Sequence, residues 1–534
     1  MKANPLHWEA TDPDVLWSAG NVSEAIPGVS TALNWSFVDD AVETAARRAF
    51  HAMGVLAGRE VTLGERTEER FMVAFYGRTC ANIEAMRMIG DRTPGTSANA
   101  VEEQLFGDVR PGAENSPTLR RVPFVALRMP RTALTLVGTQ TRFRGELVRW
   151  WRDAVLAPPA TLADAQALLV QARERYTRAF ELGTLTSMLA QALYDQLVAL
   201  AGAAGKPGLE HRLATGYAGM LETGLLSDLW DFSRGDMDRA SFLLRHGYHG
   251  PDEGQMASRV WREDPAPLLS LAGRYAKRES AAHPRLAEAR QRGVRQEAER
   301  ELLGALGRAR RPGARATLRI AQTLIPGREV GKANYTQALD GARVAARVIG
   351  GALAADGRLD DADDVFGLTY DELVADRLPA DLRERAAERI ALREDYLTTD
   401  LPEKWTGPPQ RVARQVASNG HAPDEPLSGE GCGGGAVVGL VRIVADPADD
   451  ALQPGEILVC RSTDPGWVSL FSLAGGIAVD MGGRMSHAGI VARELGMPCV
   501  TCTVDGTRRL RTGDRVRLDG DAGRIEILER KVQA

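Results

Sequence analysis

The chain contains few cysteines and few aromatic residues for its length. Its 534 residues include 5 cysteines, and aromatic side chains make up 6% of the sequence. Such sparse cysteine usage fits a reducing compartment and argues against an oxidising one. No apolar stretch is as long as a membrane-spanning helix needs, and the first residues contain no apolar core of signal-peptide length. These absences predict a cytoplasmic protein.

Blocks of like charge are also absent. The 66 basic and 71 acidic residues give a formal net charge of −5, which argues against a nucleic-acid-binding or membrane-binding surface. A hydrophobic fraction of 44% and a charged fraction of 26% are typical of globular domains. A chain of this length is expected to form about three or four domains with large buried cores.

Helical periodicity marks three stretches within the first 410 residues. The longest such stretch runs from Thr161 to about Ala201, where a Thr161-x-x-Asp164 capping pattern precedes apolar residues at helical spacing. A second stretch, from about 286 to 310, carries charges of both signs, as solvated helices do. A third begins at Arg328 and continues to about Leu353. This part of the chain is therefore predicted to be mostly helical.

The pattern changes after a segment rich in proline and glycine. Prolines cluster between Leu401 and Gly435, together with a glycine run around Cys432, which is typical of a linker. The sequence thus predicts an α+β protein with a large, mostly helical domain over residues 1–410, a linker over 411–430 and a small β/α domain over 431–534. Within the small domain, short alternating runs separated by glycine turns predict strands at 437–444, 456–460, 476–480, 515–518 and 524–528.

The most informative stretch lies in the small domain, from Gly482 to Pro498. The glycines at its start permit a sharp turn, and the apolar residues after His487 predict a short helix that ends at Gly496. His487 is thereby placed at a helix N-terminus, where backbone donors and the helix dipole stabilise negative charge. Because a neutral imidazole is a nucleophile near pH 7, this histidine is able to carry a phosphoryl group. A capped helix behind a glycine turn explains the same spacing without any chemistry.

This stretch and the later Thr512–Gly520 segment resemble the phosphohistidine (swivelling) domain of the phosphoenolpyruvate-utilising enzymes. The resemblance implies that His487 takes a phosphoryl group on one protein surface and delivers it on another. It also implies that Gly482, Gly483 and Ser486 help to bind that group.

Two positions depart from the pattern of the family. Met485 replaces a threonine or similar small polar residue, and Gly489 replaces alanine, serine or threonine. A hydroxyl at position 485 would help to hold the imidazole or its phosphate, so these two replacements raise the question of how readily His487 is phosphorylated.

The large domain resembles the substrate domain of rifampicin phosphotransferase and related proteins. One block of the resemblance, Phe242–Glu253, contains His246, His249 and Glu253. Two imidazoles and a carboxylate are common metal ligands, but the glycines and the proline of this block argue against one shared helical face, so no metal is predicted. The resemblance instead implies that His249 and Glu253 belong to the acceptor site, with His249 at a position where the family has arginine.

A second block, Pro326–Lys332, resembles the "R-E-x-x-K" block of the same substrate domains. Arg328 and Lys332 are four residues apart and therefore lie on one helical face, ready to bind a phosphoryl group. A solvated helix start is the alternative. The segment is not a nucleotide phosphate loop, because only three residues separate its glycines and Ala333 stands where serine or threonine should bind Mg²⁺.

Together the resemblances imply a phosphotransferase subunit. His487 would relay a phosphoryl group from a separate ATP-grasp protein, which binds ATP and Mg²⁺, to a small-molecule acceptor on the large domain. No cofactor is expected to bind this chain directly. Two alternatives stay open: a condensing ligase in which phosphorylation activates an acid or aldehyde, as in the related prodigiosin-forming enzymes, and a regulatory relic in which the phosphoryl chemistry is lost.

Overall fold

The computed structural model describes residues 4–10, 12–19, 26, 28–106, 109–217, 219–279, 283–413, 425–445, 452–463, 467–484 and 486–531. Met485 and most of the predicted linker, residues 414–424, lie outside the described residues. The chain divides into two compact units. Unit 1 comprises Met1–Leu185, Gly254–Ser258 and Val330–Gln415, and unit 2 comprises Thr186–Glu253, Arg259–Glu329 and Val416–Ala534.

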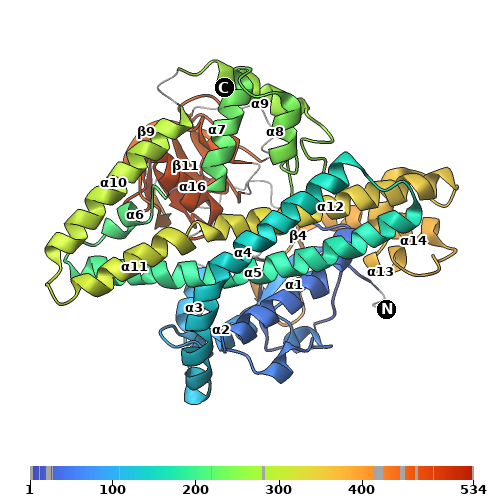
Figure 1. Cartoon of the computed structure of the whole chain (residues 1–534), viewed down its shortest axis with the longest axis horizontal. Helices are drawn as coiled ribbons and strands as arrows, with labels where there is room; N and C mark the ends of the chain where they lie inside the picture. The colour runs from blue at the N-terminus through green and yellow to red at the C-terminus, as the bar shows by residue number, and fades with distance from the viewer. Residues whose placement is uncertain are drawn as a thin grey trace. The chain divides into compact units, whose positions relative to one another are not determined.

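Unit 1 is mainly helical and contains a small sheet of order β2-β3-β1-β5 and a two-stranded ladder of β4 and β6 (Figure 1). Its strands are β1 (Leu16–Ser18), β2 (Met72–Phe75), β3 (Arg78–Asn82), β4 (Thr399–Asp400), β5 (Lys404–Thr406) and β6 (Val412–Ala413). Its helices are α1 (Ala32–Ala52), α2 (Ile83–Arg92), α3 (Ala98–Phe106), α4 (Val122–Leu156), the first part of α5 (Leu162–Ala203), most of α12 (Gly327–Ala355), α13 (Tyr370–Leu373) and α14 (Leu382–Leu397), with short 3-10 helices at Gly58–Val61, Thr67–Glu69, Leu119–Arg121 and Ala362–Gly367.

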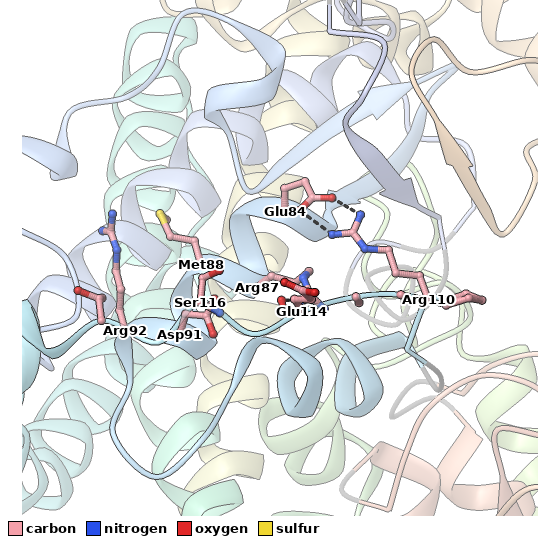
Figure 2. Close-up of a pocket in the computed structure, with 12 residues that line it drawn as sticks. Glu84, Arg87, Met88, Asp91, Arg92, Arg110, Glu114 and Ser116 are labelled. Atoms are coloured by element: carbon pink, nitrogen blue, oxygen red, sulfur yellow. Dashed lines mark hydrogen bonds and ion pairs between the residues drawn. The ribbon is translucent and has the colours of Figure 1, made fainter.

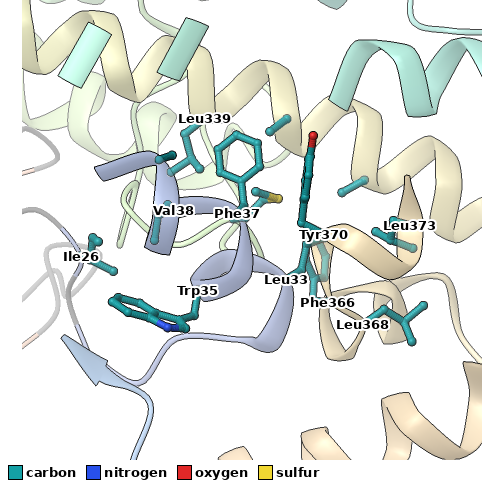
Figure 3. Packing of buried hydrophobic residues seen from close by; sticks show 14 of the residues in the cluster. Ile26, Leu33, Trp35, Phe37, Val38, Leu339, Phe366, Leu368, Tyr370 and Leu373 are labelled. Carbon is teal, nitrogen blue, oxygen red and sulfur yellow. The ribbon is translucent and has the colours of Figure 1, made fainter. Parts of the chain in front are cut away.

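The core of unit 1 joins segments that are far apart in the sequence. Helix α1 begins at Thr31, whose hydroxyl accepts a hydrogen bond from the Asn34 backbone N–H at 3.2 Å, and its apolar face is buried. Figure 3 shows Phe37 of this helix packed beside Leu339 and Tyr370. The rings of Phe37 and Tyr370 meet edge to face with centroids 6.0 Å apart. This packing explains why the ends of unit 1 form one body.

Unit 2 combines helices with the larger sheet. Its helices are the second part of α5, α6 (Leu209–Leu213), α7 (Leu221–Ser233), α8 (Arg239–His246), α9 (Ala266–Ala276), α10 (Pro284–Ala305), α11 (Arg311–Leu324), the start of α12, α15 (Val468–Phe471), α16 (His487–Leu495) and α17 (Gly506–Arg509). Its strands are β7 (Leu427–Ser428), β8 (Glu430–Gly431), β9 (Ala436–Ile443), β10 (Ile457–Cys460), β11 (Gly476–Val479), β12 (Cys499–Thr501), β13 (Arg515–Asp519) and β14 (Arg524–Glu529).

The sheet of unit 2 is mixed, with the order β7-β14-β13-β9-β10-β11-β12-β8. Its central strands β9 to β12 pair in parallel, and antiparallel strands flank them on both sides. Parallel neighbours need crossover connections, and α16 supplies the one between β11 and β12. The loop after β11 therefore leaves the carboxyl end of a parallel strand, where α/β sheets commonly place their sites.

One hydrophobic core in unit 2 is shared by the helices α7 and α9 and by the sheet. Leu229 and Trp230 of α7 and Leu271 of α9 belong to the same buried cluster as Phe471 and Ile477 of the C-terminal region. These side chains are at most 3% exposed. The helices and the sheet of unit 2 are thus joined by apolar packing as well as by chain connections.

The predicted fold class is confirmed. The helices predicted at 161–201 and from 328 onward correspond to α5 and α12, and the five predicted strands correspond to β9, β10, β11, β13 and β14. The helix predicted at 286–310 corresponds to α10, which ends at Ala305, so the last five residues of the prediction lie in the break before α11. The predicted domain limits at 410 and 431 stay a prediction, because unit 2 contains residues from both sides of them. Among the described helices, none combines the length and the apolar character that crossing a membrane requires.

Candidate functional site

His487 is the first residue of α16. Strand β11 ends at Val479, and the loop that follows turns at Gly482, whose φ of +99° is a conformation that favours glycine. Ser486 then caps the helix, because its hydroxyl accepts a hydrogen bond from the Gly489 N–H at 3.4 Å. The helix ends at Gly496, which has a φ of +69°. The predicted short helix and its glycine stop are therefore confirmed.

The ring of His487 is held by a carboxylate that the sequence did not indicate. His487 Nδ1 lies 2.8 Å from Oε1 of Glu222 at the start of α7, and the two side chains are 4% and 11% exposed. An ionised carboxylate can only accept, so Nδ1 carries the proton in this hydrogen bond. The remaining nitrogen, Nε2, then has the lone pair that a nucleophile needs. Phe471 lies beside the ring, with centroids 5.9 Å apart.

Two further carboxyl groups lie near this pair. Glu329, at the start of α12, accepts a hydrogen bond from the Leu221 backbone N–H at 2.8 Å. Burial, and the negative charge of Glu222 beside it, raise the pKa of Glu329 well above its usual value. Burial and the neighbouring Glu329 likewise raise the pKa of Glu494 to about 8. These shifts favour the neutral form of both carboxyl groups.

The C-terminal end of α16 is fixed to the turn between α6 and α7. The Gly216 N–H donates to Glu494 Oε2 at 3.0 Å, and the Thr215 hydroxyl donates to the backbone carbonyl of Arg493 at 2.8 Å. Both residues of that turn are buried. Together with the His487–Glu222 contact, these bonds hold both ends of the helix against the same helical segment.

The glycine at position 489 has a steric explanation. A Cβ atom built on Gly489 would lie 2.8 Å from the Arg484 backbone oxygen and 3.0 Å from Cys432 Sγ, which is closer than packed side chains approach. The alanine, serine or threonine expected from the family would therefore collide with Cys432. Met485, the other departure from the family pattern, lies outside the described residues.

The His246–Glu253 block forms two separate histidine–carboxylate pairs. His249 Nδ1 lies 2.8 Å from Glu253 Oε2, and both side chains are buried. His246 Nε2 instead lies 2.8 Å from Asp228 Oδ2 on α7. Burial lowers the pKa of His246 despite this partner. Within the described part of the chain, no three His, Cys, Asp or Glu side chains converge as metal ligands do.

Arg328 and Lys332 both lie in the first turns of α12, and both are half-buried. Their spacing of four residues places them on one face of that helix, as predicted. The division between the two units falls between Glu329 and Val330, so Arg328 belongs to unit 2 and Lys332 to unit 1. Their assignment to an acceptor site stays a prediction.

A groove of about 490 Å³ in unit 1 contains none of the predicted site residues. Figure 2 shows that its lining is dominated by charged groups from α2 and from the loop that follows α3. Arg110 forms two hydrogen bonds with Glu84, and Arg87 pairs with the buried Glu102. The groove therefore has cations that are already neutralised by carboxylates, which makes it a poor candidate for phosphoryl chemistry.

The sheet, the crossover helix and the histidine at its N-terminus define the class of this region. Residues 452–523 match the family described as PEP-utilising enzyme, mobile domain. Residues 187–329, which supply Glu222, Glu329 and the His249 pair, match the rifampicin phosphotransferase fourth domain. Two regions of the chain thus match domains of the PEP-utilising enzymes and of rifampicin phosphotransferase, as the motifs indicated.

Individual relatives agree with these matches. A rifampicin phosphotransferase of Streptomyces sp is 30% identical over 325 residues, which cover 58% of this chain and 37% of the relative. The prodigiosin synthesizing transferase PigC of Serratia marcescens is 30% identical over 302 residues, or 54% of this chain and 33% of the relative. The uncharacterized phosphotransferase YvkC of Bacillus subtilis is 34% identical over 200 residues, or 35% and 24%. The chain thus spans between a quarter and two fifths of the length of these relatives.

The sequence pointed to some members of this site and missed others. Glu329 stood inside the quoted "R-E-x-x-K" block and Glu494 inside the His487 stretch, but neither was assigned a role. Glu222 lies in an ordinary apolar helix start, Met220-Leu221-Glu222, and no local pattern marks it. A carboxylate 265 positions before its histidine is found only through the fold.

Proposed function

We propose that this chain is a phosphotransferase component that carries a phosphoryl group on Nε2 of His487. The observation that carries the proposal is the His487–Glu222 hydrogen bond of 2.8 Å, at the N-terminus of a helix in a segment that matches a PEP-utilising mobile domain. The bond fixes the proton on Nδ1 and leaves Nε2 as the nucleophile. The helix N-terminus and the backbone of Gly482 and Gly483 supply donors for the phosphoryl oxygens.

The donor in this proposal is a separate ATP-grasp protein that binds ATP and Mg²⁺, as the family resemblance implies. The acceptor is a small molecule with a hydroxyl group, bound near His249, Glu253 and Arg328. Arg328 and Lys332 would neutralise the charge on the transferring group, which is an electrostatic role and not a covalent one. The chain would work in the cytoplasm, where its five free cysteines stay reduced.

Labelling tests the phosphohistidine directly. The chain is incubated with the donor protein, Mg²⁺ and ATP labelled at the γ- or β-phosphorus, and in parallel with phosphoramidate, a small phosphoryl donor. Acid-labile, alkali-stable label should appear on the wild type and be absent from His487→Ala. Label of the same kind and amount on His487→Ala would refute the proposal.

Discharge of the label tests the acceptor side. Arg328→Ala and Lys332→Ala should form phosphohistidine at nearly the wild-type rate but transfer it to the acceptor about 10²-fold more slowly, the typical cost of losing one preorganised charged donor. Arg319→Ala is the matched control, because Arg319 is an exposed cation of the neighbouring helix α11. If both variants transfer the phosphoryl group to the acceptor at the wild-type rate, the two side chains take no part in transfer and only begin a solvated helix.

One observation favours a second outcome of the same chemistry. The relative from Serratia marcescens is named as a prodigiosin synthesizing transferase. In this second candidate function, the phosphoryl group activates an acceptor for condensation and is not retained in the product. The mass of the product formed with candidate acceptors separates the two outcomes: a phosphoester gains the phosphoryl group, whereas a condensation releases it.

A further inference from the structure

The contact between Glu222 and His487 affects the transfer of the phosphoryl group from His487 to the acceptor as well as the phosphorylation of His487. In a histidine phosphorylated on Nε2, the ring leaves when the P–N bond breaks. If Nδ1 has no proton, the ring must leave as an imidazolate anion, which is a poor leaving group. If Nδ1 carries a proton, the ring leaves as neutral imidazole. A carboxylate that accepts from Nδ1–H favours the protonated ring.

We propose that Glu222 is a positioning residue that keeps the proton on Nδ1 of phosphorylated His487 and so makes the ring a good leaving group. The proposal rests on the proposed function, because it concerns the discharge of the same phosphohistidine. In the step, the P–Nε2 bond breaks and its electron pair stays on Nε2. A bond forms between phosphorus and the acceptor oxygen, the acceptor's hydroxyl proton leaves to solvent, and Nδ1 keeps its own proton.

The geometry supports a permanent role for this contact. Glu222 is the second residue of α7, and Leu225, Leu226 and Leu229 of that helix are buried in the same cluster as Ala488 and Val491 of α16. Both helices therefore belong to one apolar core, and the carboxylate is nearly buried, at 11% exposure. A hydrogen bond shielded from water in this way is stronger than an exposed one.

The carboxyl group of Glu329 lies beside Glu222. Burial and the charge of Glu222 raise the pKa of Glu329, which favours the neutral form of Glu329 and limits the repulsion between the two groups. Other charged or titratable groups near α16 include Glu210 and His211 of α6, Tyr217 of the turn before α7, Arg295 and Glu299 of α10, Arg484 of the preceding loop, Cys432 and Cys499, and Arg493 and Glu494 of α16 itself.

The test compares Glu222→Gln with the wild type after charging with phosphoramidate. The full chain is labelled with ¹⁵N-histidine; with 8 histidines in the sequence, the phosphorylated ring can be followed by NMR through a pH titration. We expect Glu222→Gln to lower the pH at which Nδ1 of the phosphorylated ring loses its proton by at least about one unit, and to slow discharge at neutral pH about tenfold, since one unit is a factor of ten in the protonated fraction.

Glu494→Gln is the matched control. It removes a carboxyl group of the same cluster, but one that binds the Gly216 N–H and not the ring. A clearly smaller shift in Glu494→Gln than in Glu222→Gln supports the proposal, and equal shifts in both variants, or no shift in Glu222→Gln, overturn it. A wild-type chain that takes up no phosphoryl group on His487 from any donor would instead refute the proposed function itself.

Discussion

Ionisation of Glu494 should make this protein less stable as the pH rises. Its carboxyl group is buried at the end of α16, accepts a hydrogen bond from the Gly216 N–H at 3.0 Å, and lies near the carboxyl group of Glu329. These surroundings raise its pKa in the folded chain to about 8, from a value of 4.5 in the absence of burial. The folded state therefore binds more protons than the unfolded state between these two pH values, and stability must fall as the pH rises.

The size of the effect follows from the same two values. Each unit of pKa difference corresponds to about 1.36 kcal/mol, so ionisation of this one group should cost the wild type up to about 4 kcal/mol between pH 5 and pH 9. Glu494→Gln removes the ionisation and keeps an oxygen that can accept from Gly216. The variant should match the wild type within about 1 kcal/mol at pH 5 and exceed it by roughly 3 kcal/mol at pH 9.

Urea unfolding followed by tryptophan fluorescence measures this difference at pH 5, 7 and 9. Glu301→Gln serves as the control, since Glu301 is a surface carboxylate paired with Lys206 and Arg212 and should leave the alkaline behaviour of the wild type unchanged. If Glu494→Gln and the wild type lose stability in parallel from pH 5 to pH 9, Glu494 titrates as an ordinary carboxyl group and the account of the cluster is wrong.

Two further predictions concern packing and a buried ion pair. Gly489→Ala should destabilise the chain by up to about 2 kcal/mol, because overpacking costs about 1–3 kcal/mol and the gain in helix propensity returns about 1 kcal/mol. Adding Cys432→Ala should recover part of the loss, and independent effects in a double-mutant cycle of urea midpoints would contradict the steric explanation. Arg389 donates to both oxygens of the buried Glu372, at 2.6 and 2.9 Å, and the pKa of Glu372 is lowered to about 2. The stabilisation from Glu372 is therefore present above about pH 4.5 and lost as the pH falls toward 2. Arg389→Met should lower the stability by about 1–3 kcal/mol at pH 7 and reduce the further loss of stability on going to low pH. If thermal unfolding shows the same pH dependence of stability in the variant and the wild type, the ion pair contributes little.

Local patterns predicted the secondary structure of the functional region well. The glycine turn, the capping serine, the apolar spacing and the glycine stop of α16 all depend on residues within about 15 positions of His487, and each has a direct conformational cause. The parallel strands also follow from short apolar runs between turns. Secondary structure of this kind is visible because its determinants are close together in the sequence.

The surroundings of the histidine could not be predicted in the same way. Glu222, which contacts His487, comes from α7, and the neighbouring carboxyl groups Glu329 and Glu494 come from α12 and α16, so this grouping depends on how the helices pack. The metal site considered at His246 and His249 shows that residues close in the sequence need not act together. The sequence places these two rings close together, but the fold gives each its own carboxylate partner. Tertiary packing decides both outcomes, and one sequence contains no separate signal for it.

The shared core of unit 2 limits how the protein can be cut. An expressed fragment that begins at residue 431 would retain the sheet and His487 but lose α7 and α9, and with them the apolar cover of Phe471, Ile477 and Val491. Such a fragment would expose a continuous apolar surface and would also leave His487 without Glu222. A phosphocarrier fragment therefore has to keep α7 and α9 together with the sheet, so that both halves of this core are present. By the same reasoning, any movement that transports His487 without breaking this core has to transport α7 with it.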